Sequence, residues 1–226
     1  MTFYAGLDLA QSSDYSGLAI IERVNVPPVF RLRHLEKLPQ KMSYPDQCAL
    51  VVKVCARVGH LCGGMLPTLA IDYTSVGTPV YDILKSMYQG SLVGVLITGG
   101  SQVIREGHII RIPKRDLVSR LRVELEAGQL KIARQLPTAE EFVEELQDFE
   151  LKVNESGHVS YDAVRGHDDM VLAVAIALYI AYDKGHGSGE MFRTPIIRDG
   201  VYPTRTNIRL PFGHSKIPRF TEVGNV

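Results

Sequence analysis

Several features that would restrict the function are missing from this sequence of 226 residues, beginning with an excess of charge of either sign. Because 25 Lys and Arg residues balance 25 Asp and Glu residues, the overall charge does not indicate a nucleic-acid partner, and any electrostatic footprint must be local. A secretory signal is also missing, since Met1–Asp8 carries an acid where an apolar segment is required. The apolar run Met170–Tyr182 is too short to cross a bilayer. We therefore expect a cytoplasmic protein with no membrane partner.

Cysteine is scarce, with only Cys48, Cys55 and Cys62, spaced seven residues apart. On a helix this spacing puts the three on one face with roughly 10 Å between neighbours. That separation is too large for a disulfide or a shared metal ion. We expect unpaired thiols buried on a helix face, which suits a reducing compartment.

The hydrophobic pattern predicts an α/β protein. Three consecutive strands joined by short turns predict an antiparallel meander, and the helices and strands that alternate after them predict parallel pairing. A capping box (TAEE) at Thr138 predicts a helix start. From Gly185 the composition changes, so we expect one domain of residues 1–184 and a C-terminal tail of residues 185–226. The expected strands are 3–10, 16–24, 29–38, 68–72, 91–98 and 129–133, the expected helices are 44–61, 80–87, 114–127, 138–146 and 168–182, and the expected hairpins are 99–112, which would project, and 149–161.

Four acidic residues lie where apolar surroundings are expected. Asp8 is in the first strand, Asp72 ends the strand 68–72, and Asp168 and Asp169 open the apolar helix. An isolated carboxylate in such surroundings costs roughly several kcal/mol, and neither strand supplies a Lys or Arg. Hard oxygen ligands favour Mg²⁺ or Mn²⁺. Two such ions about 3.5–4 Å apart serve phosphoryl transfer, so we expect a two-metal site with Asp8 at its centre.

Each of these acids also has an ordinary explanation. Asp8 and Asp72 could be turn or capping residues, and Asp168–Asp169 could be an acidic first turn, which the helix dipole favours. Asp14 either forms an Asx-turn or supports a metal ligand from behind. His167 either orients a ligand or a water molecule, or is a surface or capping histidine. The sequence leaves open which of the two helix acids binds which ion.

These acids stand in motifs that resemble the nuclease domain of tailed-phage terminase large subunits, a branch of the ribonuclease H-like superfamily. The motifs are Gly6–Ala10 (GLDLA), Asp14–Ile21 (DYSGLAII), Leu69–Asp72 (LAID) and Gly166–Ala173 (GHDDMVLA), of which the last is the most specific. The resemblance covers residues 1–184. It implies a mixed sheet, with a three-strand antiparallel meander plus parallel strands, flanked by helices, and an added β-hairpin that residues 99–112 could supply.

The resemblance also implies an activity, namely metal-dependent cutting of double-stranded DNA when viral genome packaging starts and ends. In that family the carboxylates that match Asp8, Asp72 and Asp168–Asp169 bind two divalent metal ions. The implied partners are double-stranded DNA, a packaging ATPase, and portal or small-terminase components, in the host-cell cytoplasm if a phage encodes the chain. The ATP-binding loop G-x-x-x-x-G-K-S/T of the usual packaging ATPase domain is missing. We therefore expect an excised or separately encoded nuclease domain.

DNA contacts would have to come from local basic residues, each of which could instead be a solvated surface cation. Arg165, just before the acids, could touch the scissile phosphate. Basic residues in the tail could hold DNA or a packaging partner. The candidate DNA-binding residues are Arg165, Lys114, Arg115, Arg120, Arg122, Arg105 and Arg111.

Other functions stay open at this point. The same fold could cut a Holliday junction or, as a ribonuclease H-type nuclease, an RNA–DNA hybrid, although the hairpin and the GHDD motif favour the terminase. GLDLA followed by Ser12–Ser13 faintly resembles the phosphate-binding hairpin of an actin-like ATPase, but a second Gly-rich phosphate loop is missing. A DNA- or portal-binding module without activity would need the acids only for structure.

Overall fold

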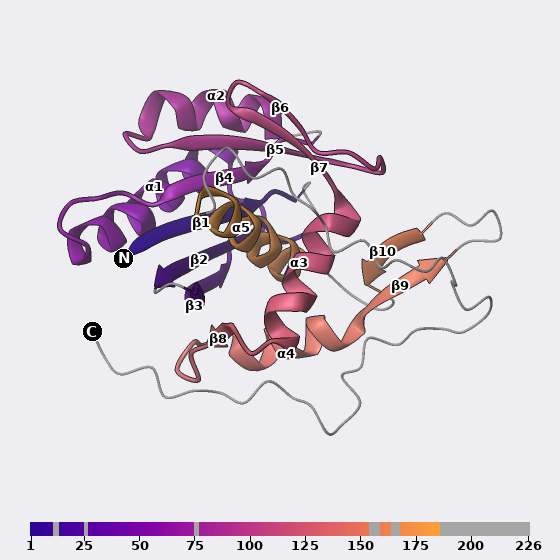
Figure 1. Cartoon of the computed structure of the whole chain (residues 1–226). Helices are drawn as coiled ribbons and strands as arrows, with labels where there is room; N and C mark the ends of the chain where they lie inside the picture. The colour runs from indigo at the N-terminus through magenta and orange to yellow at the C-terminus, as the bar shows by residue number, and fades with distance from the viewer. Residues whose placement is uncertain (11–13, 25–26, 75–76, 154–158, 164–167, 186–226) are drawn as a thin grey trace.

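A computed structural model describes residues 1–10, 14–24, 27–74, 77–153, 159–163 and 168–185. Its centre is a mixed eight-stranded sheet in the order β6-β7-β5-β4-β1-β2-β3-β8 (Figure 1). The α/β fold class expected from the sequence is confirmed. The strands are β1 (Thr2–Asp8), β2 (Gly17–Val24), β3 (Val29–Lys37), β4 (Thr68–Asp72), β5 (Leu92–Thr98), β6 (Ile104–Glu106), β7 (Ile109–Pro113) and β8 (Leu130–Ile132).

The direction of the strands decides which of their ends meet. β1, β2 and β3 form the expected antiparallel meander, and β1, β4, β5 and β7 run parallel to one another. The C-terminal ends of β1, β3, β4, β5 and β7 therefore lie at the same edge of the sheet, where the N-terminal end of β2 also lies. We call this the acidic edge, because Asp8 and Asp72 end two of these strands.

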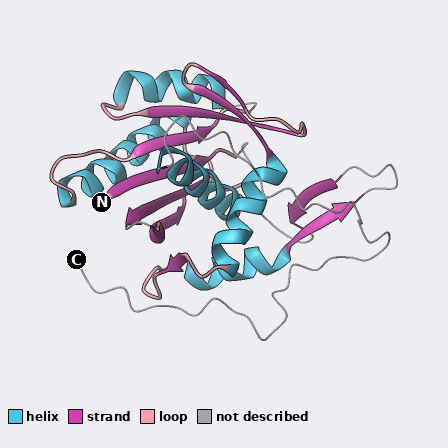
Figure 2. Cartoon of the chain, viewed as in Figure 1, coloured by secondary structure: helices cyan, strands magenta, loops and turns pink. Residues whose placement is uncertain are grey.

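Helices cover both faces of the sheet (Figure 2). One face packs against α1 (Tyr44–Leu61) and α2 (Gly77–Met87) through Leu7, Leu18 and Ile71. The other packs against α3 (Lys114–Glu126), α4 (Ala139–Asp148) and α5 (Asp169–Gly185), with Tyr4 and Ala19 in the contact. Since side chains alternate between the faces along a strand, Asp8 and Asp72 fall on the face that α5 covers.

The central helix α5 lies close to the sheet because the residues between them are small. Met170 to Ala181 are all buried, as expected for a helix that is apolar on every side. A Cβ atom added to Gly6 would come within 2.7 Å of the backbone nitrogen of Ala177, and one added to Gly17 would lie 2.5 Å from the carbonyl oxygen of Asp169. Side chains at these two positions would hold the helix away from β1 and β2.

The structure corrects two details of the expected fold. The hairpin expected at 99–112 is present as β6 and β7, but it belongs to the main sheet and is not a separate projection, because β7 pairs with β5 and β6 forms the outer edge. The hairpin expected at 149–161 is confirmed as β9 (Phe149–Val153) with β10 (Val159–Ala163), a separate two-stranded sheet beside the end of α4 (Figure 1). Thr138 makes no capping hydrogen bond to α4, and its hydroxyl donates to the carbonyl oxygen of Leu35 at 2.8 Å.

The cysteines and the tail complete the comparison with the expected fold. Cys48 and Cys55 are buried on α1, whereas Cys62 follows the end of that helix and is half-buried. Residues 186–226 lie outside the described part, so the expected tail stays a prediction. Among the described helices, none combines the length and the apolar character needed to cross a membrane.

Candidate functional site

Asp8 and Asp72 leave neighbouring strands side by side at the acidic edge. Leu7 of β1 is in register with Ile71 of β4, and each aspartate is the next and last residue of its strand. Asp8 is buried, with 7% of its surface exposed. Asp72 is half-buried, and its Oδ1 accepts a hydrogen bond of 2.8 Å from the backbone N–H of Thr74.

Asp168 and Asp169 reach the same edge from the start of α5. The backbone N–H of Leu172 donates to the carbonyl oxygen of Asp168 at 2.9 Å, which places Asp168 immediately before the first turn. Asp169 is the first residue of the helix and is 8% exposed, while the side chain of Asp168 is 27% exposed. The buried helix therefore mounts one enclosed and one more accessible carboxyl group.

Electrostatics link all four acids. Burial raises the pKa of Asp8 well above its usual value, and the negative charges of the other three raise it further. Burial also raises the pKa of Asp72, against hydrogen bonds from Thr74 and from the side chain of Asp8. The structure thus brings together the four acids that the sequence singled out, in an arrangement that disfavours full ionisation without a cation.

Lys114 supplies a positive charge at this cluster. Its Nζ lies 3.3 Å from Oδ2 of Asp168 and 5.9 Å from the centre of the Phe149 ring. Its charge lowers the pKa of both Asp8 and Asp72, although burial outweighs it. The sequence pattern predicted a DNA contact for Lys114 and did not predict its place beside the acids. The available signal was that β7 ends at the acidic edge and Lys114 follows it directly.

The donor set suits a hard divalent cation, because it consists of carboxylate oxygens beside one another at partly buried positions. Within the described ranges, however, no three His, Cys, Asp or Glu side chains surround one point closely enough to form a ready metal site. Binding would thus require the carboxylates to close on the ion. The residues that could hold it are Asp8, Asp72, Asp168 and Asp169.

The comparisons with known proteins show the family and the fold of this chain. The sequence profile of the terminase RNaseH-like domain matches residues 5–180, which is most of the chain. The chain belongs to the terminase RNaseH-like family. A search of curated proteins gives no match. Membership of this family confirms the resemblance that the GLDLA, LAID and GHDD motifs indicated.

Solved structures similar to this terminase RNaseH-like chain include three viral nuclease domains. The large terminase nuclease of thermophilic phage G20c shares 21% identity over 79% of this chain and 81% of its own, with a TM-score of 0.57. The human cytomegalovirus terminase nuclease domain shares 18% sequence identity over 79% of this chain and 82% of its own, with a TM-score of 0.52. The P22 large terminase nuclease domain shares 15% sequence identity over 80% of this chain and 82% of its own, also with a TM-score of 0.52. At these identities the similarity shows the ribonuclease H-like fold.

Most of the other predicted residues of this terminase RNaseH-like chain do not join the acid cluster. Asp14 is exposed, and His167 and Arg165 lie outside the described residues. The five arginines expected to contact DNA form ion pairs with nearby acids, and two of these pairs join residues four apart on α3. These pairs are Arg105–Asp183, Arg111–Glu106 (3.3 Å), Arg115–Asp116 (3.2 Å), Arg120–Glu124 (3.1 Å) and Arg122–Glu126 (2.7 Å).

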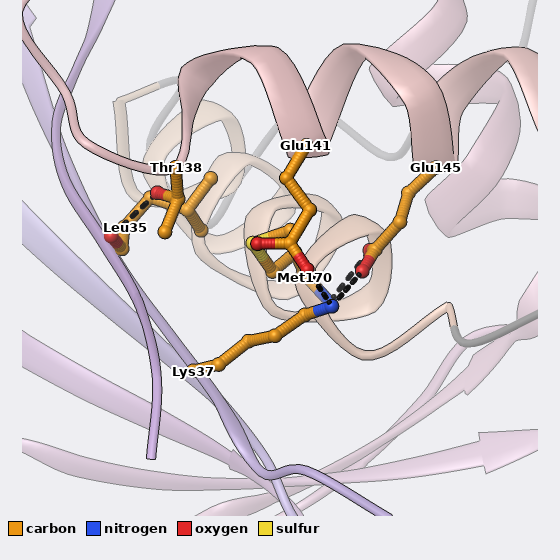
Figure 3. Close-up of polar contacts among 6 residues, drawn as sticks. All are labelled: Leu35, Lys37, Thr138, Glu141, Glu145 and Met170. Carbon is orange, nitrogen blue, oxygen red and sulfur yellow. Dashed lines mark hydrogen bonds and ion pairs between the residues drawn. The ribbon is translucent and has the colours of Figure 1, made fainter. Parts of the chain in front are cut away.

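A second polar cluster, which the sequence did not predict, contacts the first turn of α5 (Figure 3). Glu145 of α4 accepts a hydrogen bond of 3.2 Å from the backbone N–H of Met170. Lys37, at the end of β3, lies 2.7 Å from Glu145 and 2.6 Å from Glu141. No local sequence pattern predicts these contacts, because the four residues come from three separate elements, β3, α4 and α5.

Proposed function

We propose that this chain is a divalent-metal-dependent endonuclease that hydrolyses double-stranded DNA during viral genome packaging. The observation that carries the proposal is the meeting of Asp8 and Asp72 with the start of α5, where burial and mutual repulsion raise the pKa of Asp8. Family membership supports a nuclease. The G20c nuclease has been solved with bound cobalt and with bound magnesium, and the human cytomegalovirus domain has been soaked with manganese. These ions are the kind that the carboxylates here would take.

The proposed mechanism assigns a task to each acid. Asp8, the most enclosed, would be the central ligand of two Mg²⁺ or Mn²⁺ ions, which Asp72 and the helix acids would help to hold. Bound ions of this kind lower the pKa of a water molecule and stabilise the leaving oxygen of a phosphodiester. Lys114 is placed to contact a phosphate oxygen once its partner Asp168 turns toward a cation. α5 serves as a rigid support, because all of its central residues are packed in the core.

The chain would work with partners that supply the other steps of packaging. We propose double-stranded DNA as the substrate, with a packaging ATPase and portal or small-terminase components as protein partners. Arg105, Arg111, Arg115, Arg120 and Arg122 would contact DNA only by exchanging their present acidic partners for phosphates. This exchange predicts binding that weakens steeply with salt.

Plasmid cleavage tests the proposal. The chain is incubated with supercoiled plasmid in EDTA, Mg²⁺ or Mn²⁺, beside Asp8→Asn, Asp72→Asn and the control Asp82→Asn. Asp82 is an exposed acid on α2, on the opposite face of the sheet. We expect nicking and linearisation that need the metal, that Asp8→Asn and Asp72→Asn abolish, and that Asp82→Asn leaves unchanged.

Other results of the same assay would refute the nuclease or favour another substrate. Absence of cutting with both metals, or equal cutting by the Asp8 and Asp72 variants, would refute the nuclease. Stronger cutting of a four-way junction or of an RNA–DNA hybrid than of linear duplex would favour the resolvase or ribonuclease H alternative.

A further inference from the structure

The first turn of α5 has an unusual source for one of its hydrogen bonds. The first N–H groups of a helix have no partner within the helix and are normally satisfied by a side chain just before it. Here the N–H of Met170 donates to Glu145, which lies on α4 and is 8% exposed. Asp168 is in the local capping position, but its carboxylate pairs with Lys114. Glu145 thus occupies a capping place, and Asp168 is directed toward the candidate metal site.

Lys37 connects this contact to the sheet row that carries Asp8. Asp8 pairs with Gly17 across β1 and β2, and Gly17 pairs with Lys37 across β2 and β3. The Lys37 ammonium then lies 2.7 Å from Glu145, which accepts the Met170 N–H next to Asp169. Backbone pairing, an ion pair and a hydrogen bond therefore form a continuous path from Asp8 to the helix acids, and Figure 3 shows its last part.

We propose that Glu145 is a positioning residue, held by Lys37, that fixes the first turn of α5 at the acidic edge, so that Asp168 and Asp169 stay within reach of a divalent cation bound by Asp8. The inference rests on the proposed function for its effect on cutting, but its effect on cation binding does not require that DNA be cut. Partners that orient metal ligands from behind typically contribute about 10- to 100-fold to metal affinity or activity.

Glu141 provides a matched control. It lies one helical turn before Glu145 and also pairs with Lys37, at 2.6 Å, but it is 50% exposed. Figure 3 shows it on the same side of α4, with the Met170 contact made by Glu145. A role limited to neutralising Lys37 would make the two glutamates equivalent, whereas positioning singles out Glu145.

The experiment measures Mn²⁺ affinity by calorimetric titration of the full chain, together with the plasmid nicking rate and the melting temperature. Glu145→Met removes the acceptor of the Met170 N–H. The double variant Glu145→Met with Lys37→Met also removes the partly buried counter-charge, which avoids an unpaired ion. We expect the double variant to melt near the wild type, yet to bind Mn²⁺ about tenfold more weakly and to nick more slowly through kcat rather than KM. Glu145→Gln keeps an oxygen for the Met170 N–H and should restore affinity to within about threefold. Glu141→Gln should match the wild type.

The outcomes separate this inference from the proposed function. Wild-type Mn²⁺ affinity in the double variant, or an equal loss in Glu141→Gln, would overturn the positioning role. A wild type that binds no Mn²⁺ would overturn it as well. If the wild type binds Mn²⁺ but cuts no DNA, the nuclease proposal fails, and the affinities of the variants still decide the role of Glu145.

Discussion

Replacing Gly17 with alanine should separate the two sides of the acid cluster. Gly17 opens β2, pairs with Asp8 and lies under the first turn of α5. The added Cβ would meet the carbonyl oxygen of Asp169 at 2.5 Å and its carbonyl carbon at 2.9 Å. Both are backbone atoms, so they cannot rotate away as a side chain could. The start of the helix must move, and Asp169 must move with it.

The size of this movement sets the size of the effect. An ordinary contact of a Cβ begins near 3.4 Å, so the 2.5 Å approach requires the backbone of Asp169 to retreat by about 0.9 Å. Misplacement of a reacting group by about 1 Å costs on the order of 100-fold in rate. Overpacking of a core costs about 1–3 kcal/mol, which lowers the melting temperature by roughly 2–12 °C in a domain of this size. The rate should therefore fall far more than the folded fraction does.

Nicking rates at a temperature well below both melting transitions would check this prediction, because the variant is then almost entirely folded. Gly99→Ala is the control, since no atom lies within 4 Å of its Cβ position, and it should leave both rate and stability unchanged. Gly6→Ala meets the middle of α5 and should cost more stability than Gly17→Ala does. A Gly17→Ala variant that nicks at the wild-type rate would refute the close-packing argument, as would a loss no larger than that of Gly99→Ala.

Two further predictions concern the charge of the site. Lys114→Met removes the cation beside Asp168 and should lower the melting temperature in EDTA by several degrees. In Mg²⁺ the melting temperature should fall by less. An equal fall in both solutions would show that Lys114 does not offset the negative charge of the acids. The pKa of Asp8 is higher in the folded state than its unfolded value of about 3.9. The contribution of Asp8 to stability is therefore fully present below the unfolded pKa and is lost as the pH rises through the folded-state pKa. In EDTA, Asp8→Asn should therefore gain melting temperature relative to the wild type as the pH rises above the unfolded value of about 3.9. Calorimetric scans that show the same difference at every pH would contradict the raised pKa of Asp8.

The sequence predicted the acid cluster because its signals are local and periodic. Asp8 and Asp72 each end an apolar strand, and parallel strands bring their C-terminal ends together. The bounds of α1 and β4 were predicted to the residue, because turn-forming Gly63 and Gly64 separate two regular patterns. These features require knowledge only of neighbours in the chain and of strand direction.

The contacts that support the cluster could not be predicted in this way. Glu145 reads as an ordinary acid on an amphipathic helix, and only the packing of α4 against α5 brings it to the N–H of Met170. Thr138 fits the capping-box pattern, but its hydroxyl donates a hydrogen bond to the carbonyl oxygen of Leu35 instead. Where a side chain has both a local and a distant partner available, the tertiary structure determines which of the two it binds. No single stretch of sequence encodes that choice.

The position of α5 against β1 also has a consequence for biosynthesis. Asp8 belongs to the first strand, and its partners on α5 belong to the last described helix, so nearly the whole domain must leave the ribosome before the two can meet. Contacts so distant in sequence form late in folding. A partly translated chain would present β1 and β4 without the acids that complete the cluster. The proposed nuclease activity would therefore be withheld until both parts of the acid cluster have been synthesised.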